Sequence, residues 1–170
     1  MLTEVLGVCA AAGFETELYQ AGGREVRGCR HCNGCSELKH CVIGDWINEV
    51  YEKMKAADAI ILGSPTYFFD LTPEIKAVMD RCGYVCRRDG FSFSRKIGAA
   101  VSAVRRAGGI TTLDSIQHFF LINDMVVPGS TYLNISLSQA EGDYHKDTEG
   151  INTMRRLGEN IVWLCQKTRT

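Results

Sequence analysis

The sequence has no long hydrophobic run and no surplus of basic residues. Charged or polar residues interrupt every apolar stretch before it reaches membrane-spanning length, so we expect no membrane partner. The 170 residues carry a net charge of −1, which argues against a nucleic-acid partner. The segment Met1–Val5 lacks the basic and apolar regions of a signal peptide. These absences predict a cytoplasmic location.

The sequence also lacks internal repeats, low-complexity tracts and linker-like segments. Its length suffices for one domain with a buried core, so we expect a single domain over residues 1–170. No Ser/His/Asp arrangement or paired carboxylate set argues for hydrolysis.

Cysteine, by contrast, is abundant, with eight in the chain. Four of them are spaced C-x2-C-x2-C-x5-C between residues 29 and 41, and the two short gaps place three sulfurs around one small volume. That spacing favours a 4Fe–4S cluster. Structural zinc usually takes two separated C-x2-C pairs and is the second choice. Disulfides are the third option, and a loop of incidental thiols is the simplest alternative. Cysteines this close rarely form good disulfides. The predicted metal ligands are Cys29, Cys32, Cys35 and Cys41.

Buried strands and amphipathic helices alternate along the rest of the chain. Apolar periodicity and capping residues predict helices over 3–12, 45–57, 111–123, from 72 onward and around 151–164. Short apolar or alternating runs predict strands over 14–19, 59–63, 97–104 and 125–128. Cys82 and Cys86 lie on an apolar helix stripe and are expected in the core. This alternation predicts an α/β fold with a parallel sheet covered on both faces.

Two strand ends carry residues suited to a ligand, because open parallel sheets bind ligands at the carboxyl ends of their strands. The first end follows the predicted strand over 59–63 and combines hydroxyls, a proline-fixed turn and two aromatic rings. These groups suit a flat heteroaromatic ring such as an isoalloxazine. An ordinary strand-to-helix turn explains it equally well. The second end follows the predicted strand over 97–104 and carries arginines and glycines. The arginines can neutralise a phosphate or a reduced flavin, and the glycines let the backbone approach a ligand closely. A solvated arginine pair is the simpler interpretation of that end taken alone. The candidate residues are Ser64, Pro65, Thr66, Tyr67, Phe68, Arg105, Arg106, Gly108 and Gly109.

In this order, the cysteine run, the Gly63–Tyr67 turn, the Leu71–Arg81 helix and the Arg105–Gly109 turn resemble the iron–sulfur flavoproteins, a branch of the NADPH-dependent FMN reductase group with a flavodoxin-like three-layer fold. The resemblance spans essentially the whole chain. It implies one FMN and one 4Fe–4S cluster per subunit. It also implies a homodimer or homotetramer, and electron transfer from a reduced donor such as ferredoxin.

The sequence departs from this family in two places. After the glycine pair it has Ile110-Thr111 where relatives often carry Gln-Glu. The family also opens with a strand and a phosphate-binding loop, whereas this sequence begins at the helix that follows them. We therefore expect a gap in the sheet between residues 14–19 and 59–63. We also expect that Met1 is not the natural start and that roughly 20 upstream residues supply the strand and loop.

Three functions remain open at this point. The first is a redox flavoprotein that uses FMN and a 4Fe–4S cluster. The second is an NAD(P)H-dependent FMN or quinone reductase whose cysteines hold zinc or nothing. The third is a truncated, non-catalytic domain.

Overall fold

The protein has a three-layer α/β architecture, and the computed structural model describes residues 1–168. Its parallel sheet contains β1 (Ala59–Pro65), β2 (Ile97–Val104) and β3 (Ile135–Leu137) in the order β1-β2-β3. This confirms the predicted α/β class.

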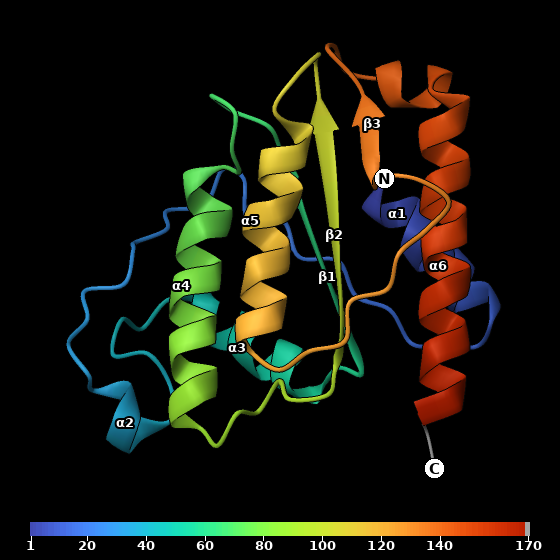
Figure 1. Cartoon of the computed structure of the whole chain (residues 1–170). Coiled ribbons are helices and arrows are strands. Elements are labelled where there is room, and N and C mark those ends of the chain that lie inside the picture. Colours follow the sequence, from blue (N-terminus) through green and yellow to red (C-terminus); the bar gives the residue numbers. More distant parts are fainter. Residues whose placement is uncertain (169–170) are drawn as a thin grey trace.

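Helices cover both faces of the sheet (Figure 1). On one face lie α3 (Trp46–Ala56), α4 (Pro73–Arg88) and α5 (Gly109–Ile122), which share one hydrophobic core cluster. On the other face, α1 (Leu2–Ala11) packs against α6 (Thr148–Thr168) over a second cluster. Two short helices complete the described elements, α2 (Cys35–Leu38) and a 3-10 turn at Asp143–Lys146.

The local sequence explains where the helices near the candidate sites begin. Asp45 caps α3 by accepting a hydrogen bond from the backbone N–H of Ile47, and Pro73 occupies the first turn of α4. Cys82 and Cys86 are fully buried on α4, as predicted. At Gly98 of β2 a Cβ atom would overlap the ring of Phe120, so glycine lets α5 lie close to the sheet.

Two of the predicted strands are absent from the described residues. Residues 14–19 do not form a strand, and together with β1 they line a cavity of about 550 Å³. Near residue 126 the chain forms only an isolated bridge, through Val126 and Ile97. The next residue on the same side is Pro128, which has no N–H to donate, so pairing stops there. The chain returns to the sheet at β3, which the sequence pattern did not predict.

The cavity lies along the free edge of β1. Asp58 and Thr66 flank β1 in the sequence. The Asp58 carbonyl accepts a hydrogen bond from Ile97 N, and Thr66 N donates to the Ala103 carbonyl, so the backbone N–H and C=O groups of even-numbered residues point toward β2. Because backbone groups alternate along a strand, the odd-numbered residues face the opposite edge, and there no strand of residues 1–168 pairs with them.

Among residues 1–168, no helix combines the length and apolarity needed to cross a bilayer.

Candidate functional site

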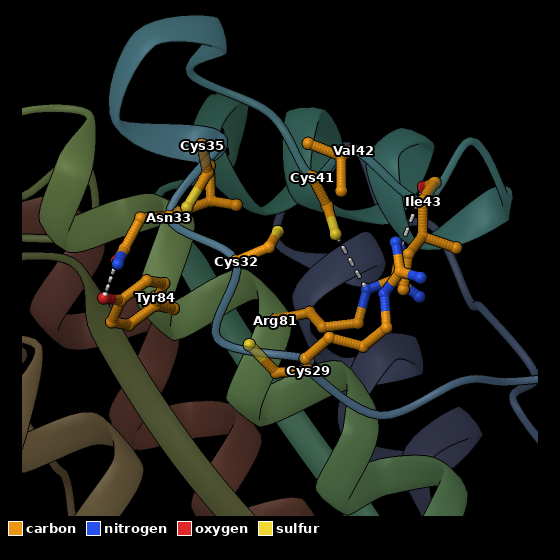
Figure 2. A pocket seen from close by; sticks show the side chains of 11 residues that line it. Cys29, Cys32, Asn33, Cys35, Cys41, Val42, Ile43, Arg81 and Tyr84 are labelled. Carbon is orange, nitrogen blue, oxygen red and sulfur yellow. Dashed lines mark hydrogen bonds between the residues drawn. The ribbon is translucent and has the colours of Figure 1, made fainter.

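The four cysteines of the 29–41 loop line one pocket, together with Arg81, Tyr84 and Val85 of α4. Figure 2 shows the four side chains gathered from one loop over that helix. The sulfur environments differ, because Cys35 is buried at the start of α2, Cys41 is partly buried, and Cys29 and Cys32 are exposed. The structure thus brings together all four predicted ligand residues.

The backbone of this loop alternates in handedness. His31 and Asn33 have φ values of +52° and +61°, whereas Gly34 has a φ of −57°. Such alternation turns successive N–H groups to one side and makes a concavity that recurs at phosphate and iron–sulfur sites. One of these amides, His31 N, already donates to the Cys29 sulfur at 3.4 Å. The loop therefore has the form of a cradle for a negatively charged group.

Helix α4 fixes the position of the loop. The Tyr84 hydroxyl donates to Asn33 Oδ1 at 2.5 Å, and Lys39 Nζ donates to the Arg88 carbonyl at 2.7 Å. Within the loop, a Cβ atom at Gly34 would overlap Val42 Cγ1, so glycine allows its two halves to pack together. The loop is held at several points and is not a free segment.

The surroundings of Cys35 disfavour its thiolate form. The pKa of the Cys35 thiol is raised, chiefly because burial disfavours the thiolate and also because the neighbouring cysteine sulfurs repel it. A metal ion bound at this pocket would oppose this effect, because its positive charge stabilises the thiolate, which is the form that binds a metal.

The placement of the four cysteine side chains bears on which metal groups they could hold. In the described part of the chain, no three side chains of His, Cys, Asp or Glu are placed to bind a single ion. A zinc site needs its sulfurs about 2.3 Å from one ion, whereas each cysteine of a cubane cluster binds a different iron. Among the described residues, the four cysteines therefore share one pocket without three of them being placed around a single ion position.

The second candidate region lies at the carboxyl ends of β1 and β2. Pro65 pairs with Ala103 in the sheet, and Thr66 N donates to the Ala103 carbonyl at 2.8 Å, so residues 64–68 and 105–109 lie side by side. Gly108 has a φ of +90°, and a Cβ atom there would come within 2.8 Å of Phe69 Cα. Glycine is therefore required at this point for the two turns to meet.

The first turn displays aromatic rings in an unusual conformation. Tyr67 and Asp70 exchange backbone hydrogen bonds of 2.8 and 3.1 Å, which closes a tight turn. Its central residues, Phe68 and Phe69, have φ values of +47° and +68°, which glycine or asparagine would adopt at lower cost. The Phe68 side chain is fully exposed and that of Phe69 is 66% exposed. Strain and exposure of this kind are typical of ligand-binding turns.

Several predicted binding groups are already engaged within the protein. The Ser64 hydroxyl donates to the Pro65 carbonyl and accepts from Thr72 N, and the Thr66 hydroxyl lies 2.9 Å from those of Ser102 and Thr112. Gly109 is buried, and a Cβ atom there would meet Ile135. What this region offers a ligand is therefore its backbone, the rings of residues 67–69 and the exposed side chains of Arg105 and Arg106.

Sequence reasoning missed two residues of these regions. Phe69 was left outside the predicted turn, although the Phe-Phe pair was a visible signal. Arg81 received no role, although it stands beside the apolar stripe of α4 and is buried in the structure.

Comparisons with known proteins agree with this description. Residues 1–140 match the NADPH-dependent FMN reductase family. An iron–sulfur flavoprotein of Methanocaldococcus jannaschii is 38% identical over 169 residues, which cover 95% of this chain and 86% of that protein. An iron–sulfur flavoprotein of Methanosarcina thermophila is 35% identical over 96% of this chain and 87% of its own length.

Solved structures support the fold alone, because their sequences are distant. A flavodoxin, WrbA-like protein from Agrobacterium tumefaciens superposes with a TM-score of 0.61 at 17% identity, covering 71% of this chain and 74% of that one. RosB with a bound flavin-derived intermediate gives a TM-score of 0.65 at 14% identity, covering 99% and 73%. The chain is therefore flavodoxin-like, and it belongs to the iron–sulfur flavoproteins within the NADPH-dependent FMN reductase family, a group of oxidoreductases.

Proposed function

We propose that this protein transfers electrons between a reduced donor and an acceptor through FMN and a 4Fe–4S cluster. Cys29, Cys32, Cys35 and Cys41 are the proposed cluster ligands, and residues 64–69 and 105–109 are proposed to hold the flavin ring. The observation that carries the proposal is the cradle of alternating backbone handedness in which these cysteines gather.

Each part of the chain has a definite task in this scheme. When bound, FMN exchanges one or two electrons and the cluster exchanges them singly. The cysteine thiolates hold the iron, and the His31 amide, which donates to the Cys29 sulfur, limits the cost of added negative charge. At the other region, the 67–69 rings supply apolar contact, and Arg105 and Arg106 favour an anionic ligand.

The two regions lie near opposite ends of α4, which bears on the quaternary structure. The cysteine loop contacts Arg81, Tyr84 and Arg88, whereas the strand ends lie near Pro73. At about 1.5 Å per residue, eight to fifteen residues of helix separate them by roughly 12–22 Å. A homodimer or homotetramer that sets one subunit's cluster beside another subunit's flavin would shorten the distance over which an electron moves between the two centres. The exposed rings of Phe68 and Phe69 are a surface that a second copy or a donor such as ferredoxin would cover.

A second candidate is an NAD(P)H-dependent FMN or quinone reductase without a cluster. The match of residues 1–140 to the NADPH-dependent FMN reductase family favours it. That family membership weighs against a non-catalytic domain. For either candidate we propose a cytoplasmic location, where thiols stay reduced.

An absorption spectrum of the anaerobically purified protein tests the proposal. Flavin bands with a broad shoulder near ~400 nm are expected, because an iron–sulfur cluster adds absorbance beyond that of the flavin. Flavin bands alone, with a rapid reduction by NADPH, would favour the second candidate instead.

A further inference from the structure

Arg81 is the most completely bonded charged side chain around the cysteine loop. It projects from α4 beneath the pocket, and its side chain has no exposed surface (Figure 2). A guanidinium has five N–H donors, and here there is one acceptor for each. Nε donates to Cys41 Sγ at 3.3 Å, and the two terminal nitrogens donate to both carboxylate oxygens of Asp45 at 2.7 Å and to the carbonyls of Arg27 and Ile43.

These acceptors bracket the cysteine loop. Arg27 stands two residues before Cys29, and Ile43 stands two residues after Cys41. Asp45, which also caps α3, holds the guanidinium in a bidentate pair that fixes its plane and therefore the direction of Nε–H. One rigid group thus ties both ends of the loop to one helix and directs a donor at one sulfur.

A purely structural ion pair between Arg81 and Asp45 does not account for the bond from Arg81 Nε to the Cys41 sulfur. The two bonds to Asp45 already offset much of the cost of burying the charge, and the carbonyls satisfy two further donors. The remaining N–H could have met another carbonyl, yet it meets the sulfur of a proposed metal ligand. Hydrogen bonds to ligand sulfurs are among the means by which a protein sets the potential of an iron–sulfur cluster.

We propose that Arg81 is a positioning residue of the metal centre: it clamps both ends of the cysteine loop, and its Nε–H···Sγ bond to Cys41 raises the reduction potential of the cluster. This inference rests on the proposed function. One electron from the reduced donor adds one negative charge to the cluster, and part of it falls on the ligand sulfurs. The hydrogen bond from a cation is stronger to the more negative sulfur, so it stabilises the reduced state. The guanidinium keeps its proton throughout.

The test compares anaerobic holoprotein variants in a redox titration followed by electron paramagnetic resonance. Arg81→Gln removes the charge, and Arg81→Lys keeps the charge but loses the fork that directs Nε–H. Both variants should shift the cluster potential to more negative values, Arg81→Gln by the larger amount. Arg87→Gln is the matched control, because Arg87 is exposed on the same helix and donates to the Ile122 carbonyl. The cluster potential of this variant should equal that of the wild type. An unchanged potential in Arg81 variants that retain their iron would overturn the inference.

A measurement on the wild-type holoprotein decides the question if the Arg81 variants do not assemble a cluster. With arginine labelled by 15N at Nε, one Nε–H resonance should be shifted by the paramagnetic cluster and should move when the cluster is reduced. If no arginine Nε–H resonance responds to the reduction, the inference is wrong. A wild-type protein that contains no iron would instead refute the proposed function, so the two failures are distinguishable.

Discussion

The eight cysteines separate into two groups by their surroundings. Cys29, Cys32, Cys35 and Cys41 line the pocket beside α4, and Cys35 also belongs to one hydrophobic cluster. The other four, Cys9, Cys82, Cys86 and Cys165, are buried in the two clusters and do not line the pocket. Burial raises the pKa of the Cys82 thiol well above its usual range, as it also raises that of Cys35, but Cys82 has no exposed surface and does not line the pocket. Packing therefore explains Cys82, although it lies next to Arg81 in the sequence.

Replacing a proposed ligand should have a different effect from replacing Cys82. Serine at position 29, 32, 35 or 41 should remove most of the bound iron, because a hydroxyl is a much poorer iron ligand than a thiolate. Cys82→Ala should retain the iron and should instead lower the free energy of unfolding by about 1–2 kcal/mol, through the small core cavity that it creates. Iron content and thermal unfolding check both results, and iron loss in Cys82→Ala equal to that of the serine variants would refute the ligand assignment.

The exposed ring of Tyr67 should contribute to flavin binding. Tyr67→Ala removes aromatic contact from the turn and should weaken FMN binding by about 1–2 kcal/mol. Trp163→Ala is the control, since that indole is also exposed but lies on α6, across the sheet from α4 and α5. Fluorescence titration of the apoprotein with FMN measures both affinities. An affinity in Tyr67→Ala equal to that of the control would exclude this turn from the pocket.

Which site residues could be predicted depended on whether their chemistry is visible in the sequence. Cysteine spacing was sufficient to predict that the four side chains of the 29–41 loop gather in one place, because short regular gaps keep their sulfurs close. The hydroxyls of Ser64 and Thr66 suggested ligand binding, but the chain itself satisfies them. Arg81 depends on contacts with residues up to 54 positions away, which no local pattern reveals.

At the scale of single elements, the shape of the cysteine loop depends on the close approach of Gly34 and Val42. Gly34→Ala would force a methyl group into Val42 and open the loop, so we expect a clear loss of bound iron. Gly28→Ala is the matched control: Gly28 precedes Cys29 directly, has no atom within 4 Å of its Cβ position and should leave the iron content unchanged. Equal iron contents in the two variants would show that this packing does not shape the loop.

The free edge of β1 should be visible in hydrogen exchange. Amides of Ile60, Leu62 and Ser64 face β2 and should be protected, whereas those of Ile61 and Gly63 face the cavity and should exchange at least about tenfold faster, since an unpaired amide needs no opening step. Residue-resolved exchange of the 170-residue chain measures the difference. Equal protection of both sets would mean that another segment or a second copy pairs with this edge.

The strands show where sequence patterns succeed and where they fail. Residues 59–63 and 97–104 were predicted because continuous apolar runs must be buried on both faces. Residues 14–19 alternate like a strand, but pairing also requires a neighbouring strand, and none of residues 1–168 lies beside them in that role. The three residues of β3 carry too little periodicity to be recognised alone.

At the scale of the whole molecule, α4 joins the two candidate sites. Its first turn follows the strand end that offers aromatic rings, and its last two turns hold the cysteine loop. The same helix packs its buried face against α3 and the sheet, so both sites rest on the core rather than on loops alone. This arrangement gives the proposed centres fixed positions relative to one another within the chain.

The central claim is that the four-cysteine loop holds an iron–sulfur cluster. Its most direct test is the iron and acid-labile sulfide content of anaerobically prepared protein, combined with a low-temperature paramagnetic resonance spectrum after one-electron reduction. We predict about four iron and four sulfide per chain, together with a signal that appears on reduction and is absent from the Cys32→Ser variant. Zinc in place of iron, or iron without sulfide, would contradict the account.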